Sequence, residues 1–172
     1  MNILITGTRG IAPALASVYS DHHTTMVSRS TGHDINHIDS WGDEFLSYDM
    51  VINCAYDGFA QIKVLEYFYS RWQHCAEKTL VTIGSKVTSS LRIEKDQDSQ
   101  YWPYRLHKQT LQLAHDTMAK CAACRMLIVN PGAVDTDMVA HLNIEKMLPL
   151  DLAHRIQTWV ADTAIKRVDL CL

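Results

Sequence analysis

The sequence predicts an α/β protein in which a doubly wound, parallel sheet lies between two layers of helices. Two observations favour this three-layer fold. Short apolar runs alternate with amphipathic stretches along all 172 residues. The first run leads through a glycine-containing turn into a helical pattern. Strands that alternate with helices pair in parallel, because each helix returns the chain to the same end of the sheet.

The strands are short runs of apolar and β-branched residues, as expected when both faces of a sheet are covered. They are expected at residues 2–6, 24–28, 49–54, 78–85, 124–132 and 167–172. The fourth run, KTLVTIGS, ends at Ser85. Pro131 and Gly132 end the fifth run, because proline lacks the N–H that a strand donates.

The helices are expected at residues 11–20, 39–48, 59–77, 103–121 and 148–164. Ile62, Leu65, Tyr69 and Trp72 mark one apolar stripe of the third helix. Between the strand at 24–28 and the GHDI motif there is no room for a crossover, which needs about a dozen residues. We therefore expect the sheet to lack a helix there, and whether it also lacks a regular strand stays open.

Length and composition fit a single domain over residues 1–172. Hydrophobic residues make up 47% and charged residues 20% of the chain, as in ordinary globular proteins. The net charge of -3 gives no reason to expect a nucleic-acid partner. No apolar run reaches the roughly 18 residues that a membrane span needs, and MNILITGT does not look like a signal peptide.

The five cysteines are odd in number and lie mostly in apolar surroundings, which fits a reduced, cytoplasmic location. Cys121 and Cys124 form a CxxC at the expected end of a helix. Redox pairs instead use a helix start to lower a thiol pKa, and zinc sites need a second ligand pair. The nine histidines show no metal-binding spacing. We expect no metal.

The first turn, ITGTRGIAPA, lies between a strand and a helix. Gly7 permits a tight turn there, and Gly10 lets backbone approach a phosphate group, whose charge favours a helix N-terminus. This is the setting of a phosphate-binding loop, although an ordinary turn would look the same.

Tyr104 and Lys108 are four residues apart in the expected helix YWPYRLHKQT. Side chains at this spacing lie one above the other, so they can reach a common point. A lysine ammonium beside a phenol lowers a tyrosine pKa that is otherwise about 10. The pair could therefore exchange protons near neutral pH, or it could simply form part of a solvated face.

These motifs, in this order, resemble the short-chain dehydrogenase/reductase family. The likeness runs from TGTRGI at residues 6–11 through NCA at 53–55, Ser85, and the Tyr104 and Lys108 pair to NPGAVDT at 130–136. The resemblance implies a Rossmann-type sheet that binds a nicotinamide dinucleotide. It also implies that the tyrosine and lysine carry chemistry.

The resemblance assigns a role to three side chains. Tyr104 would be the general acid/base that exchanges a proton with the substrate oxygen. Lys108 would lower the pKa of that tyrosine and bind the nicotinamide ribose. Ser85 would polarise the substrate carbonyl. Hydride passes directly between nicotinamide and substrate, so the reaction needs no metal.

The resemblance also implies a set of cofactor-binding residues on the loops after the strands. These are Gly7, Thr8, Arg9, Gly10, Ile11, Ser28, Arg29, Asp34, Ile35, Asn53, Cys54, Ala55, Tyr104, Lys108, Pro131, Gly132, Val134 and Thr136. Asp34 and Ile35 would contact the adenine, and Asn53 and Ala55 the adenine ribose.

The chain departs from the family in four ways. The glycine loop is one residue shorter, with Ala12 and Pro13 where a third glycine is usual. The gap from serine to tyrosine is longer than in many members, so Ser89 or Ser90 competes with Ser85. The asparagine that many members carry on the preceding helix is missing, and Gln61 is the nearest substitute. The substrate loop is truncated.

Cofactor choice follows from the residues after the second expected strand. An acid there would bind the ribose 2′-OH of NAD, whereas an arginine suits the 2′-phosphate of NADP. The sequence reads VSRS, with Arg29 and no carboxylate, and Arg9 can point to the same phosphate. We therefore expect NADP(H) to bind more tightly than NAD(H).

The leading hypothesis is an NADP(H)-dependent oxidoreductase that acts on a small carbonyl or secondary alcohol. The alternative is a catalytically weak dinucleotide-binding or sensor protein, and a structural protein on the same fold has least support. The family also implies a homodimer through the helices at 59–77 and 103–121. The first of these holds Tyr67, Phe68, Tyr69 and Trp72, more aromatic surface than one sheet-facing stripe needs.

Overall fold

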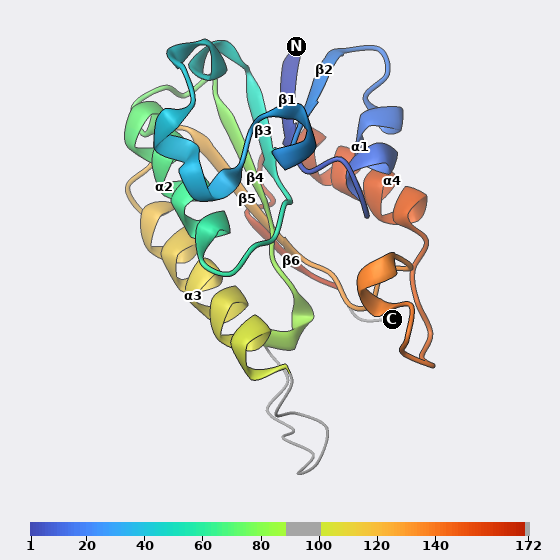
Figure 1. The fold of residues 1–172 in the computed structure, drawn as a ribbon. Coiled ribbons are helices and arrows are strands. Elements are labelled where there is room, and N and C mark those ends of the chain that lie inside the picture. Colours follow the sequence, from blue (N-terminus) through green and yellow to red (C-terminus); the bar gives the residue numbers. More distant parts are fainter. Residues whose placement is uncertain (89–100, 171–172) are drawn as a thin grey trace.

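A computed structural model describes residues 1–88 and 101–170 of the chain. Its centre is a six-stranded sheet in which every neighbouring pair is parallel, in the order β2-β1-β3-β4-β5-β6 (Figure 1). The strands are β1 (Asn2–Thr6), β2 (His23–Val27), β3 (Met50–Asn53), β4 (Thr79–Ile83), β5 (Arg125–Asn130) and β6 (Arg167–Asp169). The predicted doubly wound α/β fold is confirmed.

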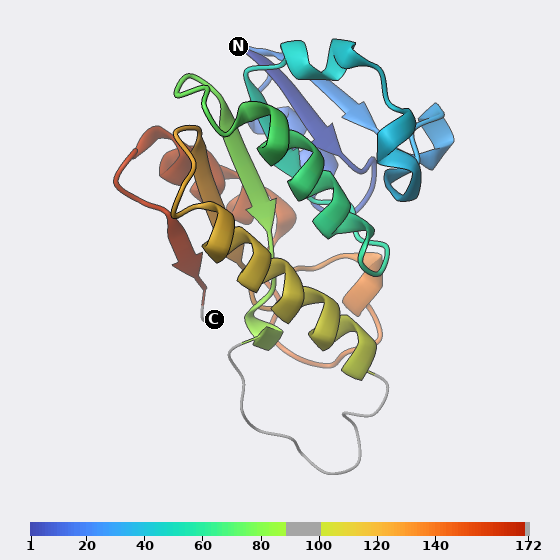
Figure 2. The same ribbon diagram turned by 90° about the vertical axis from the view of Figure 1, so that its left-hand side faces the viewer.

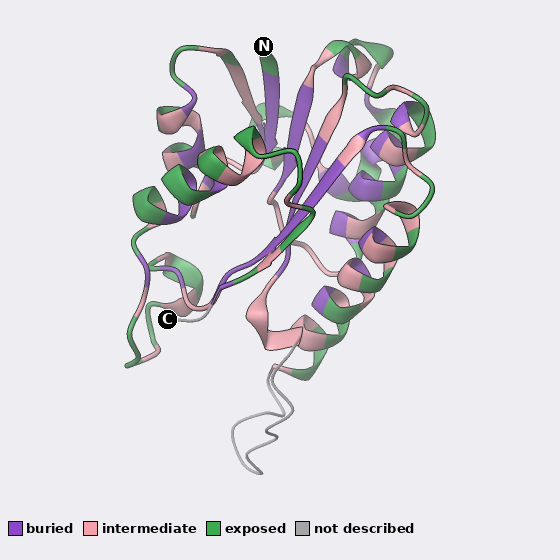
Figure 3. Cartoon of the chain, turned by 180° about the vertical axis from the view of Figure 1, so that it is seen from behind, coloured by how far each residue is buried: buried purple, intermediate pink, exposed green. Residues whose placement is uncertain are grey.

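Helices cover both faces of the sheet. They are α1 (Ala12–Val18), α2 (Ala60–Trp72), α3 (Trp102–Met118) and α4 (Pro149–Ala161). α1 packs with α4 on one face, and α2 lies beside α3 on the other, as Figure 2 shows. The sheet residues alternate between two cores: Ile3 and Ile5 belong to the α1 and α4 side, and Leu4 to the α2 and α3 side. Figure 3 shows buried strands between helices whose outer faces are exposed.

The connection from β2 to β3 differs from the sequence-based expectation. β2 is a regular strand that pairs with β1 along its whole length. The missing crossover helix is replaced by three short 3₁₀ helices, η1 (Arg29–Thr31), η2 (Ile35–Ser40) and η3 (Asp43–Ser47). The α-helix predicted at 39–48 is therefore wrong. Trp41 and Gly42, both extended in backbone, separate two of the 3₁₀ turns.

The apolar face of α2 is also shifted from the predicted stripe. Leu65 and Trp72 are buried as expected, but Ile62 and Tyr69 are only partly buried. Phe68 and Tyr67 are buried instead. η2 packs on this helix, and the Tyr67 hydroxyl donates a hydrogen bond to the Trp41 carbonyl. The aromatic excess of α2 is thus covered within the chain, which removes the expected argument that a second subunit covers it.

Residues 89–100, including Ser89 and Ser90, lie outside the described part. Among the described residues, no helix is long and apolar enough to cross a membrane. The same residues contain no group of three or more histidine, cysteine or acidic side chains that could hold a metal ion.

Candidate active site

A pocket of about 580 Å³ lies at the carboxyl ends of the parallel strands, within the range of ligand sites in proteins. It is lined from the turns after β1, β2, β3, β4 and β5 and from α3. β1 lies between β2 and β3: the chain runs from β1 to β2 on one side, and the connection after β2 crosses back to β3 on the other side. Open α/β sheets bind their ligands in the crevice at such a point.

The turn after β1 needs its glycines. Gly7 and Gly10 have φ angles of 106° and 62°, backbone conformations that residues with a side chain rarely adopt. The Gly7 N–H donates to the Val27 carbonyl at 2.7 Å, which ties the turn to β2. A Cβ on Gly7 would lie 3.5 Å from the Cys54 sulfur. The turn is thus held close to the ends of two neighbouring strands.

Lys108 is buried beside the catalytic tyrosine predicted from the sequence. Its Nζ donates to the Gln61 side-chain oxygen at 2.7 Å and to the Ile83 carbonyl at 2.9 Å. The same Nζ lies 5.7 Å from the centre of the Tyr104 ring and 5.4 Å from that of Tyr56. Burial lowers the pKa of Lys108 to about 7.

Gln61 is the suggested substitute for the missing asparagine, and its side-chain amide makes hydrogen bonds to Lys108 and to two backbone carbonyls. Its Nε2 donates to the carbonyls of Asn53 and Ile83, each at 2.9 Å. Because both amide protons are used in this way, the amide oxygen must face Lys108. The glutamine therefore binds the lysine directly.

Tyr104 and Ser85 both line the pocket. Burial raises the pKa of Tyr104, and the nearby Ser85 hydroxyl opposes that rise only in part. We expected Lys108 to lower the pKa of Tyr104 below its usual value, and that expectation is wrong. Burial disfavours the charge on the lysine as well, so neither group ionises easily.

Ser85 lies two residues beyond the end of β4. Its Oγ accepts a hydrogen bond from the Val87 N–H at 3.3 Å, which fixes the hydroxyl at the start of η4 (Lys86–Thr88). Ser85 lines the same pocket as Tyr104, whereas Ser89 and Ser90 lie outside the described residues, so the choice of Ser85 stays a prediction.

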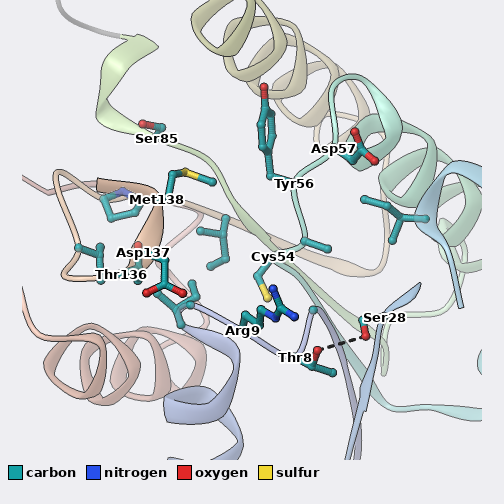
Figure 4. A pocket seen from close by; sticks show the side chains of 18 of the residues that line it. Thr8, Arg9, Ser28, Cys54, Tyr56, Asp57, Ser85, Thr136, Asp137 and Met138 are labelled. Atoms are coloured by element: carbon teal, nitrogen blue, oxygen red, sulfur yellow. Dashed lines mark hydrogen bonds between the residues drawn. The ribbon is translucent and has the colours of Figure 1, made fainter. Parts of the chain in front are cut away.

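The other end of the pocket lies beyond β2. Thr8 donates to the Ser28 hydroxyl at 3.1 Å, and Arg9 points into the pocket (Figure 4). The sequence offered no carboxylate after β2, but the fold supplies one, because Asp57 lies 3.6 Å from the Arg29 guanidinium. Both side chains are largely exposed, and such a pair contributes little stability.

With one exception, every predicted site residue lines this pocket. The exception is Asn53, whose side chain is fully buried and donates to the Gln61 carbonyl at 2.9 Å. Asn53 therefore joins β3 to α2 and cannot touch the adenine ribose, so that assignment is corrected.

Several pocket residues carried no signal in the sequence. They are Ser30, His33, Tyr56, Asp57, Ile83, Gly84, Asp137, Met138 and Val139. Tyr56 is the most prominent. It rises from the end of β3 with its hydroxyl pointing away from Arg9 and Cys54 (Figure 4). That hydroxyl lies 2.9 Å from Nδ1 of His107, and its ring meets the Tyr104 ring edge to face at 4.9 Å. Only the fold brings these loop and helix residues together.

Comparison with solved structures defines the class of fold. A short-chain dehydrogenase from Burkholderia cenocepacia J2315, in complex with NADP, matches with a TM-score of 0.76 and 13% identity over 99% of this chain and 88% of that chain. A short-chain dehydrogenase/reductase from Vibrio parahaemolyticus matches with a TM-score of 0.69 and 15% identity over 98% of each chain. A ketone-specific alcohol dehydrogenase from Comamonas testosteroni matches with a TM-score of 0.73 and 14% identity over 99% and 86%.

The chain therefore has the fold of the short-chain dehydrogenase/reductases. No protein-family model matches the sequence, and no curated protein matches it. The likeness is thus one of structure rather than of sequence.

Proposed function

We propose that the protein is a compact short-chain dehydrogenase/reductase that uses NADP(H) to reduce a small carbonyl compound or to oxidise the corresponding secondary alcohol. The observation that carries this proposal is the meeting of Ser85, Tyr104 and Lys108 beside one pocket. A protein that only bound a dinucleotide would gain little from a buried lysine next to a buried phenol.

Tyr104 is the proposed general acid. Because its pKa is raised by burial, the phenol keeps its proton at neutral pH and can donate it to a carbonyl oxygen. Ser85 would donate a hydrogen bond to the same oxygen as negative charge develops there.

The residues around the pocket fit a nicotinamide dinucleotide. Lys108 donates to Gln61 and Ile83, and its ammonium form has a third N–H that could donate to a ribose hydroxyl. The Gly7 to Gly10 turn presents backbone for the phosphates, and Pro131 and Gly132 line the region near Ser85. The bound cofactor would supply the hydride.

The test of this function is a screen of purified protein for NADPH oxidation against a panel of small aldehydes and ketones. We expect turnover of at least one compound, and Ser85→Ala should lower kcat by about 10²–10³-fold, the usual effect of losing one polarising donor. A silent Ser85→Ala beside a severe Ser89→Ala or Ser90→Ala would reassign the serine. Tight NADPH binding without turnover of any compound would favour the dinucleotide-binding alternative.

The preference for NADP(H) rests on Arg29 and Arg9. Arg29 should leave its exposed ion pair with Asp57 and bind the 2′-phosphate, which makes stronger charged hydrogen bonds with the guanidinium. We expect Arg29→Ala to weaken NADPH binding by about 10- to 100-fold, the effect of losing a charged hydrogen bond, and to leave NADH binding nearly unchanged. Asp57→Asn is the matched control. It should strengthen NADPH binding, because it removes a negative charge near the phosphate.

Calorimetric titration of both cofactors into wild type and the two variants measures these changes. Equal weakening of NADPH and NADH by Arg29→Ala would remove the basis for the preference.

We also propose a homodimer, on different residues from those that the sequence indicated. α3 exposes Trp102, Leu106 and Leu113, and Leu113 is 68% exposed. Phe59, at the start of the neighbouring α2, is exposed as well. This apolar row lies on the helices through which the resembled family commonly dimerises, so a second copy of the chain is its proposed partner.

Leu113→Asp should convert the dimer to monomer, because it would bury a charge in the proposed interface. Sedimentation velocity of wild type and variant measures the change. Ile144→Asp changes an apolar residue that is also exposed but lies outside α2 and α3; it is the matched control and should stay dimeric. A wild-type protein that is monomeric at high concentration would contradict the proposal.

A further inference from the structure

The backbone of Ser85 is held by a side chain from the neighbouring strand. The Ser85 N–H donates to Oδ1 of Asn130 at 3.1 Å, and Asn130 is fully buried at the end of β5. A Cβ on Gly84 would lie only 1.9 Å from that same oxygen. The asparagine therefore packs directly against the chain that carries the serine.

Asp169 on β6 decides which way the Asn130 amide faces. Asn130 Nδ2 donates to Asp169 Oδ1 at 2.7 Å. An ionised carboxylate can only accept hydrogen bonds, so the amide nitrogen must face Asp169 and the amide oxygen must face Ser85. In the reversed orientation, the amide NH₂ would meet the Ser85 N–H, donor against donor.

Arg167, two residues earlier on the same strand, keeps Asp169 ionised and oriented. Its Nε donates to Asp169 Oδ2 at 2.9 Å. Although partial burial raises the pKa of Asp169, hydrogen bonds from Asn130 and Arg167 lower it overall. Asp169 therefore remains an acceptor at neutral pH.

The backbone carbonyl of Ser85 is also connected to β6, through the side chains of Thr88 and Gln112. The Thr88 hydroxyl donates to the Ser85 carbonyl at 3.0 Å. The Thr88 hydroxyl has no second proton to donate, so the Gln112 side-chain group 2.8 Å from it must be the NH₂, which donates to the hydroxyl. The Gln112 side-chain oxygen then accepts from the two terminal nitrogens of Arg167, at 2.9 Å and 3.0 Å. Both polar groups of the Ser85 backbone are thus connected to the ion pair on β6.

We propose that Asp169 is a positioning residue, which acts through Asn130 to hold Ser85 at the place where it meets the substrate oxygen. This inference rests on the proposed function, since it takes Ser85 as the polarising donor. Asp169 contributes an acceptor at a fixed point, and no contact with substrate or cofactor is required of it.

The test compares Asp169→Ala with Asp169→Asn in a steady-state assay. Without the acceptor, the Asn130 amide can turn and Ser85 can shift, so Asp169→Ala should lower kcat by about 10- to 100-fold, the usual effect of a small misplacement. Binding of NADPH should not change. Asp169→Asn should recover most of the activity, because an amide oxygen can still accept from Asn130. Asp21→Ala, an exposed acid in the turn between α1 and β2, is the control and should behave as wild type.

A double mutant separates positioning from general damage. If Asp169 acts only through Ser85, adding Asp169→Ala to Ser85→Ala should cause no further loss of kcat. Full activity of Asp169→Ala, or losses that multiply in the double mutant, would overturn the proposal.

Hydrogen exchange at the Ser85 amide tests the same idea without turnover. Exchange should be faster in Asp169→Ala than in wild type, and slow again in Asp169→Asn. If the wild type oxidises no NADPH, the proposed function fails, but this measurement still decides whether Asp169 holds Ser85. Unchanged exchange in Asp169→Ala would exclude that role.

A charge swap keeps the proposal testable if Asp169→Ala does not fold. Asn130→Asp alone places two carboxylates against each other and should release the Ser85 amide to faster exchange. Asn130→Asp combined with Asp169→Asn restores one donor and one acceptor at that contact, so slow exchange should return. Failure of the swap to restore it would count against the proposal.

Discussion

Tyr104→Phe should reduce NADPH-dependent turnover by about 10²–10⁴-fold, the usual contribution of a positioned general acid. The phenylalanine ring would still pack against Tyr56, so the pocket should keep its form, but the group that donates the proton would be lost. Steady-state kinetics on a compound identified in the carbonyl screen measures the loss. NADPH binding, followed by fluorescence, should stay nearly intact.

Tyr56→Phe is the matched control, since it removes a second phenol hydroxyl from the same pocket. That hydroxyl is hydrogen-bonded to His107, away from the contact between Tyr104 and Ser85. Its loss should cost far less turnover than Tyr104→Phe. If Tyr104→Phe retained full activity on the same compound, the proposed acid/base mechanism would be wrong.

Lys108 should make the stability of the protein increase with pH above neutrality. Its pKa is about 7 in the folded protein against 10.5 for an ordinary lysine. Between these values, the unfolded chain holds a proton that the folded chain has released. Unfolding then takes up a proton, so the free energy of unfolding increases with pH by up to about 1.4 kcal/mol per pH unit. Below pH 7 both states are protonated, and the full cost of the buried charge is present.

Urea unfolding of wild type and Lys108→Met at pH 7, 8 and 9, without cofactor, measures this effect. Burial raises the pKa values of the Cys54 thiol and the Tyr104 phenol, and their contribution to stability is lost as the pH rises at the alkaline end. Those groups are shared by both proteins, so the difference between wild type and Lys108→Met isolates the lysine. The difference should move in favour of wild type as the pH rises, and parallel curves would show that the lysine keeps its proton.

The fold was predictable because buried parallel strands leave a simple pattern of apolar runs. The β2 to β3 connection was not, because 3₁₀ turns have no periodic signal. Trp41 and Phe45 have the i, i+4 spacing of a helix face, yet the backbone is extended at Trp41 and Gly42. Boundaries shifted for a similar reason: the helix expected to continue to residue 77 ends at Trp72, where tertiary packing decides the end.

The site was predictable where its residues lie in short motifs and unpredictable where the fold joins distant segments. Tyr104 and Lys108 are neighbours on one helix, and the glycine turn is continuous. Asp57 meets Arg29 only because the turns after β2 and β3 lie side by side. The pKa of Tyr104 was predicted in the wrong direction. The sequence spacing shows that a lysine is near the tyrosine, but it does not show how strongly burial desolvates the phenol.

The ion pair on β6 has a second consequence, which concerns contact between molecules. β6 is at one edge of the sheet, where unpaired backbone groups could add a strand from another chain. The strand has only three residues, and two of them are the charged Arg167 and Asp169. A short, charged edge resists such pairing, because an incoming strand would have to desolvate both charges. The residues proposed to orient Ser85 thus also protect the sheet against aggregation.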